Sequence, residues 1–430
     1  MTYRAAECET LLGHASAKAV ICLSTAKDYA AAKQMLGLKS KCPKLAHVIA
    51  LGPPVKGAHG LSEMIESQTD ATLPEPPVAS DPFLLLYTSG TTSAPKGVPL
   101  SYHNMLSNAR LGAPEHGITS DDLIVSAAPF THLFGLYSFH IAMATGACNI
   151  LLPVFTPPDL ASLIERDRPT GLWTAPAHIA ACRGMGLVDK HDFSSLKLVI
   201  MSGSACPTEL VEWFQEQIPD GAVTQLWGMT ETQGGLYTRP GDPLAVSAHS
   251  AGRPSPGTEI RILDPETGAS KAPGEEGELQ IRGCLLFPGY YNNPSANEAA
   301  FAEDGWFRTG DLATADKDGN VAITGRIKDV INRGGVKYNP RDIEDLLDAH
   351  PKIALSAIVP MKDEVLGEKA CAFVTLSPGA KNVTLKALCD HLLKYKIAKN
   401  KLPEKLVVVD EMPLTPTRKI IKGKLKPPED

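Results

Sequence analysis

Short apolar runs that stop abruptly at small residues limit the fold of this chain more than any other feature. The runs at 83–87, 196–201 and 223–227 lead into Thr-Ser-Gly, Ser-Gly-Ser-Ala and Gly-Met-Thr-Glu. Each is typical of a buried strand followed by a tight turn. Helix-like stretches, such as 207–217, lie between the runs. The alternation predicts an α/β fold with a mostly parallel sheet, and we expect the three turns to line one ligand-binding edge.

The texture of the chain changes twice toward its C-terminus. After about residue 250 it is rich in glycine, and the alternating stretches 259–263 and 277–282 predict antiparallel strands. From residue 328 a smaller run of alternating strand-like and helix-like stretches follows. We therefore predict a large N-terminal domain, 1–327, with mostly parallel sheets and a β-rich subdomain, and a small α+β C-terminal domain, 328–430.

Composition excludes several classes of protein. The net charge of -6 gives no electrostatic case for binding nucleic acid or an anionic membrane. No apolar run approaches the length of a membrane span, and the first residues lack the apolar block of a signal peptide. The nine cysteines form no C-x-x-C pair, which is typical of reduced thiols. These features predict a cytoplasmic protein without stable membrane insertion.

Residues 88–97 form the first motif with clear chemistry. They read Thr-Ser-Gly-Thr-Thr-Ser-Ala-Pro-Lys-Gly, so backbone N–H and side-chain O–H groups can converge on phosphate oxygens. The order of a Walker A loop is absent, and a flexible Ser/Thr/Gly turn is the alternative interpretation. The ten-residue pattern favours a phosphate loop. Its candidate nucleotide-binding residues are Thr88, Ser89, Gly90, Thr91, Thr92 and Lys96.

Further motifs follow this loop along the chain. They are Pro-Phe-Thr-His-Leu-Phe-Gly (129–135), Ser-Gly-Ser-Ala (202–205), Trp-Gly-Met-Thr-Glu (227–231), Trp-Phe-Arg-Thr-Gly-Asp (306–311), Gly-Arg-Ile-Lys-Asp (325–329), Asn-Arg-Gly-Gly-Val-Lys (332–337) and Met-Pro-Leu-Thr-Pro-Thr-Arg-Lys (412–419). In kind and order they resemble the motifs of the acyl-adenylate-forming superfamily, the AMP-dependent synthetases and ligases. That superfamily includes acyl-CoA ligases, peptide-synthetase adenylation domains and firefly luciferase. The C-terminal part is most similar to ligases for cyclic and medium-chain acids, such as cyclohexanecarboxylate–CoA ligase.

The resemblance implies a nucleotide site with defined roles. Trp227 would lie against adenine where most relatives carry Tyr, Asp311 and Arg326 would bind the ribose, and Glu231 would hold Mg²⁺. Thr230 would contact the α-phosphate, and both Thr230 and Lys419 would act in catalysis. The family usually has Gly just before this lysine, whereas this chain has Arg418. The remaining nucleotide contacts implied are Gly203, Ser204, Ala205, Gly228 and Met229.

The resemblance also implies an acid pocket, a hinge and a thiol path. His132 would sit beside the acyl group and take part in catalysis, although a lone His in an apolar segment is more often a packed core residue. The pocket is expected to include His132, Phe134, Gly135, Ser202 and Gly235. Lys328 falls on the hinge of a mobile C-terminal domain, and Gly334 and Gly335 match the loop that lines the path of CoA.

The implied reaction is ATP-dependent activation of a small-molecule carboxylic acid to acyl-AMP, with release of pyrophosphate and transfer of the acyl group to CoA. The implied cofactors and co-substrates are ATP, Mg²⁺ and CoA. Two alternatives stay open: an adenylation enzyme that loads a carrier protein or an amine, and an inactive nucleotide-binding remnant. Family members carry a further N-terminal segment before the region that residues 1–30 resemble. A homodimer or a partner that supplies this segment therefore also stays open.

Overall fold

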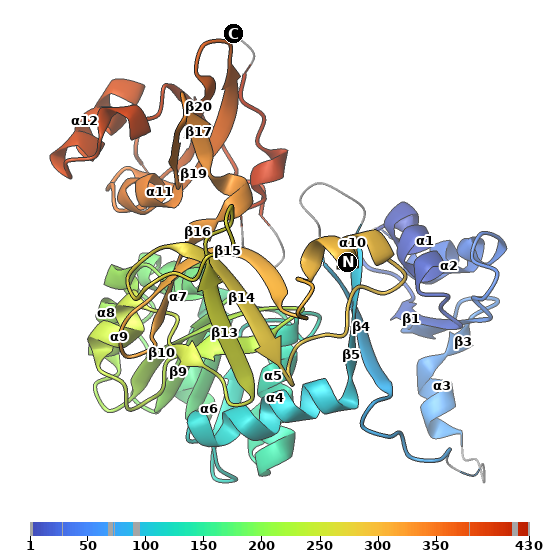
Figure 1. Ribbon diagram of the computed structural model, residues 1–430. Coiled ribbons are helices and arrows are strands. Elements are labelled where there is room, and N and C mark those ends of the chain that lie inside the picture. The colour runs from blue at the N-terminus through green and yellow to red at the C-terminus, as the bar shows by residue number, and fades with distance from the viewer. Residues whose placement is uncertain are drawn as a thin grey trace. The chain divides into compact units, whose positions relative to one another are not determined.

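A computed structural model of the chain describes residues 3–27, 29–67, 72, 74–88, 95–377, 379–414 and 420–428. The chain divides into two compact units (Figure 1). Unit 1 comprises Met1–Pro99 and Tyr290–Asn292, and unit 2 comprises Leu100–Gly289 and Asn293–Asp430. Unit 2 contains residues from both sides of the boundary that the sequence predicts between 327 and 328, so that boundary stays a prediction.

Unit 1 is built on a small parallel sheet in the order β1-β2-β3. Its elements are α1 (Ala5–His14), β1 (Ala19–Leu23), α2 (Ala31–Gly37), η1 (Leu38–Ser40), β2 (His47–Leu51), β3 (His59–Gly60) and α3 (Leu61–Glu66). The buried side chains of Met35, Leu38, Leu45 and Val48 form its core, because the apolar side of α2 covers one face of the sheet.

A separate two-stranded sheet pairs β4 (Pro82–Thr88) with β5 (Lys96–Ser101). The expectation that the run at 83–87 belongs to the same parallel sheet as the other two runs is therefore wrong. The residues of β4 are half-buried or exposed, and a short apolar run does not reveal how deeply a strand is buried. Thr88 ends β4 and Lys96 begins β5, whereas Ser89, Gly90, Thr91 and Thr92 lie outside the described residues.

The central sheet of unit 2 has seven strands in the order β12-β11-β10-β9-β8-β6-β7. Its strands are β6 (Leu123–Ser126), β7 (Cys148–Ile150), β8 (Gly171–Thr174), β9 (Leu198–Ser202), β10 (Ala222–Met229), β11 (Gln233–Tyr237) and β12 (Arg253–Pro254). The strands from β6 to β10 pair in parallel, whereas β11 and β12 are antiparallel. The parallel part confirms the α/β architecture that the sequence predicts.

Helices cover both faces of this sheet (Figure 1). They are α4 (Tyr102–Glu115), α5 (Leu133–Thr145), α6 (Pro157–Asp167), α7 (Pro176–Gly184), α8 (Thr208–Gln217) and α9 (Leu244–His249). Side chains alternate between the faces along a strand. Val199 and Met201 of β9 therefore pack with α6, α7 and α8, whereas Leu198 and Ile200 pack with α4 and α5. All five residues of β9 are buried, as is typical of a parallel strand covered on both sides.

Two further sheets complete unit 2. The strands β13 (Thr258–Leu263), β14 (Gly277–Gly283), β15 (Phe307–Ala315) and β16 (Val321–Arg326) form an antiparallel sheet, with α10 (Pro294–Ala300) between β14 and β15. This sheet confirms the antiparallel strands predicted at 259–263 and 277–282. After η2 (Ile327–Asp329), a second sheet has the order β18-β17-β20-β19, and β21 pairs with β20.

The strands of the last sheet alternate with helices along the chain. In chain order the elements are β17 (Ile331–Arg333), β18 (Val336–Tyr338), α11 (Arg341–Asp348), β19 (Ile353–Asp363), β20 (Gly367–Leu376), α12 (Leu385–Lys394), η3 (Lys399–Lys401), β21 (Lys405–Val408) and η4 (Lys422–Lys424). Ile343 and Leu347 of α11 and Leu388 and Leu392 of α12 are fully buried against this sheet. An α+β layer with its own core follows from this packing.

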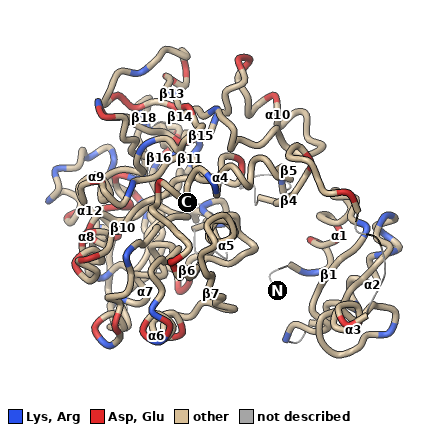
Figure 2. The backbone as a smooth tube through the Cα atoms, turned by 90° about the horizontal axis from the view of Figure 1, so that it is seen from below, with Lys and Arg blue, Asp and Glu red and all other residues tan. Residues whose placement is uncertain are grey.

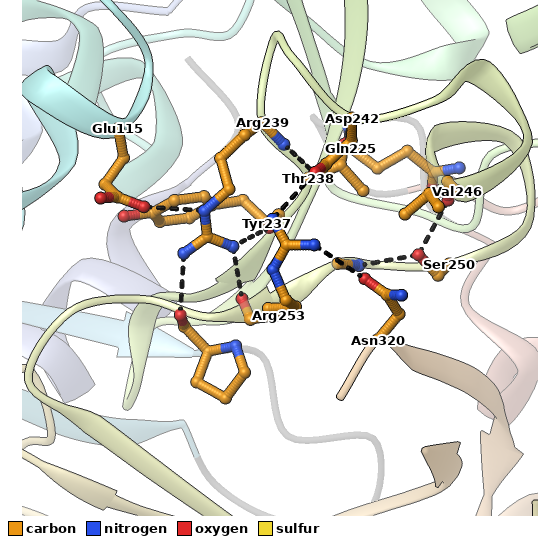
Figure 3. A network of polar contacts seen from close by, with 12 residues as sticks. Glu115, Gln225, Tyr237, Thr238, Arg239, Asp242, Val246, Ser250, Arg253 and Asn320 are labelled. Atoms are coloured by element: carbon orange, nitrogen blue, oxygen red, sulfur yellow. Dashed lines mark hydrogen bonds and ion pairs between the residues drawn. The ribbon is translucent and has the colours of Figure 1, made fainter. Parts of the chain in front are cut away.

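A polar network around Arg239 ties α4 to the corner between β11 and β12 (Figure 3). The Arg239 guanidinium donates from Nε to Glu115 Oε2 at 2.7 Å, from Nη1 to Tyr237 O at 2.9 Å and from Nη2 to Pro254 O at 3.1 Å. Arg253 donates from Nη2 to Asp242 Oδ1 at 2.8 Å. Charge-assisted bonds of this kind fix the chain at the point where it leaves strand β11.

The surface chemistry is mixed. Lys and Arg are interspersed with Asp and Glu along the backbone (Figure 2). Within the part of the chain that the structure describes, the helices are too short or too polar to cross a membrane.

His116 gives the fold a dependence on pH. Its side chain is 2% exposed, its Nε2 atom lies 3.0 Å from Tyr137 Oη, and its ring lies against Tyr237. Burial lowers the pKa of His116 to about 3. The unfolded chain therefore binds a proton at about pH 6.5 that the folded chain does not bind, and stability falls as pH falls below that value. We expect the free energy of unfolding to drop by about 1.6 kcal/mol between pH 6.5 and 5 from this group alone.

Urea unfolding at several pH values measures this effect, with His116→Gln as the comparison because glutamine does not titrate. The difference in unfolding free energy between the two proteins should change by about 1.4 kcal/mol per pH unit in the acid range. A difference that stays constant with pH would show that His116 is not held neutral by the fold.

Candidate active site

A three-residue turn joins β10 to β11 and carries Thr230 and Glu231. Met229 N donates to Thr232 Oγ1 at 3.0 Å, and Thr232 N donates to Met229 O at 3.3 Å. Phe287 N donates to Glu231 O at 2.9 Å, and Glu231 is 5% exposed. The turn is therefore held both from within and by the segment that follows β14.

Gly228 allows this hairpin to close. A Cβ atom at residue 228 would lie 1.8 Å from Gln233 O, and the pairing of β10 with β11 shifts register between Trp227 and Gly228. Any side chain at 228 would collide with backbone, so the position requires glycine. Gln233 is itself fixed, because its Nε2 donates to Asn104 O at 3.0 Å and to Leu285 O at 2.9 Å. Besides the predicted nucleotide contact, Gly228 thus shapes the turn that carries Glu231.

Three of the predicted nucleotide residues meet at one carboxylate. Asp311 of β15 is 4% exposed and is the strand partner of Arg326 on β16. Arg326 Nε donates to Asp311 Oδ1 at 2.7 Å, and Trp227 Nε1 donates to Asp311 Oδ2 at 2.9 Å. Thr309 Oγ1 accepts a hydrogen bond of 3.0 Å from Asp311 N. Residues from β10, β15 and β16 are therefore brought together around the group that the sequence assigns to ribose.

The turn after β9 lies on the neighbouring strand end. Ser202 is 5% exposed and is the strand partner of Leu226, the residue before Trp227. Gly203 follows with φ of +94°, and Ser204 and Ala205 continue the turn. Two of the three strand-end turns named in the sequence thus lie side by side at the carboxyl edge of the parallel sheet, where such sheets bind ligands.

The residues predicted for the acid pocket have clear local roles. His132 precedes α5, and its Nδ1 accepts a hydrogen bond of 3.2 Å from Phe134 N, so the imidazole caps the helix. Phe134 is buried among α4, α5 and the sheet. A Cβ atom at Gly135 would lie 2.3 Å from Pro129 O, and one at Gly235 would lie 2.9 Å from Ile281 Cδ1. Their contact with an acyl group stays a prediction.

The C-terminal candidates lie on two turns. Lys328 belongs to η2, and partial burial lowers its pKa, with Arg326 as a further cause. Gly334 and Gly335 connect β17 to β18 with φ of +60° and +86°, the combination typical of a tight hairpin turn. Gly334 N donates to Leu366 O at 2.7 Å. Lys419 lies outside the described residues.

The chain on either side of residues 415–419 is well anchored. Leu414 and Ile420 form an antiparallel bridge, and Ile421 N donates to Pro413 O at 2.8 Å. Lys422 Nζ lies 2.7 Å from Oε1 of the buried Glu344 on α11. The two ends of this segment are therefore held close together on the α+β layer formed by β17–β21, α11 and α12.

Several residues that support the site were not predicted from the sequence. Thr232 and Gln233 hold the β10–β11 turn, and Thr309 orients the backbone of Asp311. The role of Thr309 could have been predicted from the sequence, because a hydroxyl two residues before an Asp is a common local acceptor for a backbone N–H. For Gln233 the only indication in the sequence was its position close to the Trp-Gly-Met-Thr-Glu motif.

Residues 1–291 match the AMP-binding enzyme family, and residues 342–419 match the AMP-binding enzyme C-terminal domain. The chain belongs to the AMP-binding enzyme family. This confirms the resemblance drawn from the motifs. The chain is 30% identical over 428 residues to the medium-chain fatty-acid–CoA ligase of Escherichia coli (strain K12), covering 99% of this chain and 75% of that protein.

Other relatives agree in family and fold. The chain is 32% identical over 361 residues to 4-coumarate–CoA ligase 5 of Oryza sativa subsp. japonica, which covers 81% of this chain and 66% of that protein. The crystal structure of ATP-bound MatB from Rhodopseudomonas palustris superposes with a TM-score of 0.88 at 28% identity, covering 98% of this chain and 81% of that one. The predicted fold class is therefore confirmed for this member of the AMP-binding enzyme family.

Proposed function

We propose that this AMP-binding enzyme is an acid–thiol ligase that converts a carboxylic acid to an acyl-CoA thioester. The carboxylate attacks the α-phosphorus of ATP, which gives acyl-AMP and pyrophosphate. The thiol of CoA then attacks the acyl carbonyl, which gives the thioester and AMP. The observation that carries this proposal is that Trp227, next to the turn that bears Thr230 and Glu231, is hydrogen-bonded to Asp311, which also binds Arg326.

In the first step both reactants are anions, so the site must stabilise negative charge. We assign the Thr230 hydroxyl to the α-phosphate and the Asp311 carboxylate to the ribose hydroxyls. The amine of Lys419 is assigned to the charge that develops at the α-phosphorus. The loop from Thr88 to Lys96 is assigned to the other phosphates, because its hydroxyls, backbone N–H groups and ammonium suit phosphate oxygens.

Glu231 suits a magnesium ion. Mg²⁺ prefers oxygen ligands and is usually held by one or two carboxylates together with substrate phosphates. Glu231 supplies such a carboxylate on a turn fixed by Thr232 and Phe287. When bound, the ion would neutralise phosphate charge. The protein contributes the buried carboxylate and the rigid turn that keeps it next to Thr230.

The second step needs a path for the thiol. We assign Lys328 to a hinge between residues 1–327 and 328–430, and the Gly334–Gly335 turn to the wall of the CoA path. A short 3₁₀ segment such as Ile327–Asp329 can absorb a change of backbone angles, which supports the hinge.

A medium-chain acid is the substrate class we propose, because the Escherichia coli relative named for medium-chain fatty acids matches 99% of this chain. The relatives are named CoA ligases, so transfer to a carrier protein or an amine is not favoured, nor is an inactive remnant. All nine cysteines are free thiols, which supports the cytoplasm as the compartment.

The test is ATP–pyrophosphate exchange with a panel of straight-chain acids of increasing length and a few aromatic acids. We expect exchange to peak with acids of medium chain length, and thioester to form once CoA is added. A folded preparation that binds ATP but shows no exchange with any acid would contradict the proposed activity. Exchange followed by acyl transfer only to a carrier protein would show that the acceptor is a carrier protein and not CoA.

A further inference from the structure

The indole of Trp227 makes a contact that its stacking role does not require. Its Nε1–H donates to Asp311 Oδ2 at 2.9 Å, across 84 residues of sequence. Arg326 Nε donates to the other oxygen, Oδ1, at 2.7 Å. Each oxygen of this carboxylate therefore has one fixed donor from the protein.

The carboxylate needs both donors because it is buried. Asp311 is 4% exposed, and an ionised carboxylate is unfavourable in such surroundings unless hydrogen bonds satisfy it. Two carboxylate oxygens offer about four acceptor positions in all. The two bonds from Trp227 and Arg326 leave acceptor capacity on both oxygens, which matches the two hydroxyls of a ribose.

Packing fixes the indole in the position from which it donates. A Cβ atom at Gly235 would lie 3.1 Å from Trp227 Cζ3 and 2.9 Å from Ile281 Cδ1, so the absence of a side chain at 235 makes room for the ring. Trp227 also packs against the buried cluster of Leu236, Leu279 and Ala313. The ring is thus held between β11 and β14, and its N–H lies at the edge that contacts β15.

We propose that Trp227 is a positioning residue for ribose recognition, because its indole N–H holds one oxygen of Asp311 while Arg326 holds the other. This inference rests on the proposed function, since it assigns the ribose of ATP to Asp311. A phenyl ring can still lie flat against adenine, but it has no donor for Asp311. The loss of the N–H therefore affects recognition of the ribose hydroxyls and leaves the chemistry at the phosphate unchanged.

Trp227→Phe tests this. We expect the Kd for ATP, measured by calorimetry, to rise about 10-fold, because a hydrogen bond to a charged group is lost. The KM for ATP in pyrophosphate exchange should rise equally, while kcat changes less than about threefold, because the N–H contacts the ribose carboxylate and not the reacting phosphate. Preference for ATP over 2′-deoxyATP or 3′-deoxyATP should fall by about threefold or more, since these analogues already lack one of the two hydroxyls.

Two further variants sharpen the result. Trp213→Phe is the matched control, because Trp213 lies on α8 and packs against Phe214 and Arg183 away from Asp311. Benzothienylalanine in place of Trp227 keeps the bicyclic shape and replaces the N–H with a sulfur atom that cannot donate, so it reports on the hydrogen bond even where phenylalanine disturbs the packing.

The outcomes separate the inference from the proposed function. Wild-type protein that fails to bind ATP would overturn both. Wild-type protein that binds ATP, with the benzothienylalanine variant unchanged in Kd and in selectivity against the deoxynucleotides, would overturn the role of the indole N–H alone. A weaker Kd with reduced ribose selectivity and an intact kcat supports it.

Discussion

Replacing Lys419 with alanine is expected to reduce ATP–pyrophosphate exchange by about 10²–10³-fold, or about 2.7–4 kcal/mol, which is typical for the loss of one preorganised charge-stabilising contact. The lysine would act on charge that develops at the α-phosphorus, so only acyl-AMP formation should suffer. Thioester formation from supplied acyl-AMP and CoA should stay within about threefold of the wild-type rate. Measuring the two half-reactions separately checks both statements.

Lys424→Ala is the matched control for this experiment. Lys424 lies five residues further along the chain and is exposed. The control should keep both half-reactions, because an exposed lysine contributes little that salt and water do not replace. If Lys419→Ala loses both half-reactions equally while remaining folded, the role assigned to Lys419 is wrong.

Gly228→Ala is expected to have the second large effect. The added Cβ would lie 1.8 Å from Gln233 O, which is backbone and cannot turn aside like the end of a flexible side chain. Overpacking of this kind costs about 1–3 kcal/mol, and we expect the upper end of that range here. Because the hairpin must open, Thr230 and Glu231 would also shift, and a displacement of about 1 Å is enough to lower the rate by about 10²-fold.

Urea unfolding and pyrophosphate exchange together test the Gly228 prediction. Gly241→Ala is the control, because a Cβ atom there would meet nothing within 4 Å. That substitution should change stability by less than about 0.5 kcal/mol. Full exchange activity in Gly228→Ala would mean that the turn does not depend on the close approach of β10 and β11.

Local pattern was enough to predict the parallel strands β9 and β10 and the antiparallel strands β13 and β14. β9 is a short continuous apolar run, and β13 and β14 show an alternation of apolar and polar residues that is visible in the sequence. The run at 83–87 looked the same as a buried strand, yet β4 pairs outside the parallel sheet. Sequence does not show which strands become neighbours, because that depends on contacts between distant segments.

In the candidate site, too, single residues could be predicted from local sequence, whereas the contacts between them could not. Motifs identified Asp311, Arg326 and Trp227 one by one, because each lies in a recognisable string of residues. Their hydrogen bonds join strands that are 84 residues apart in the case of Trp227 and Asp311, and no local pattern encodes such a contact. His116 is a comparable case, because its lowered pKa arises from burial beside Tyr137 and Tyr237 and not from its sequence neighbours.

The bridge between Leu414 and Ile420 has a consequence for the order of the two half-reactions. With Lys422 also tied to Glu344 on α11, the peptide on both sides of Lys419 is fastened to the layer that carries Gly334 and Gly335. The role proposed for Lys419 then requires that its amine move together with this layer. A single movement of the layer would then withdraw the Lys419 amine and bring the Gly334–Gly335 turn into place. The arrangement that forms acyl-AMP and the arrangement that transfers its acyl group to CoA would therefore exclude each other.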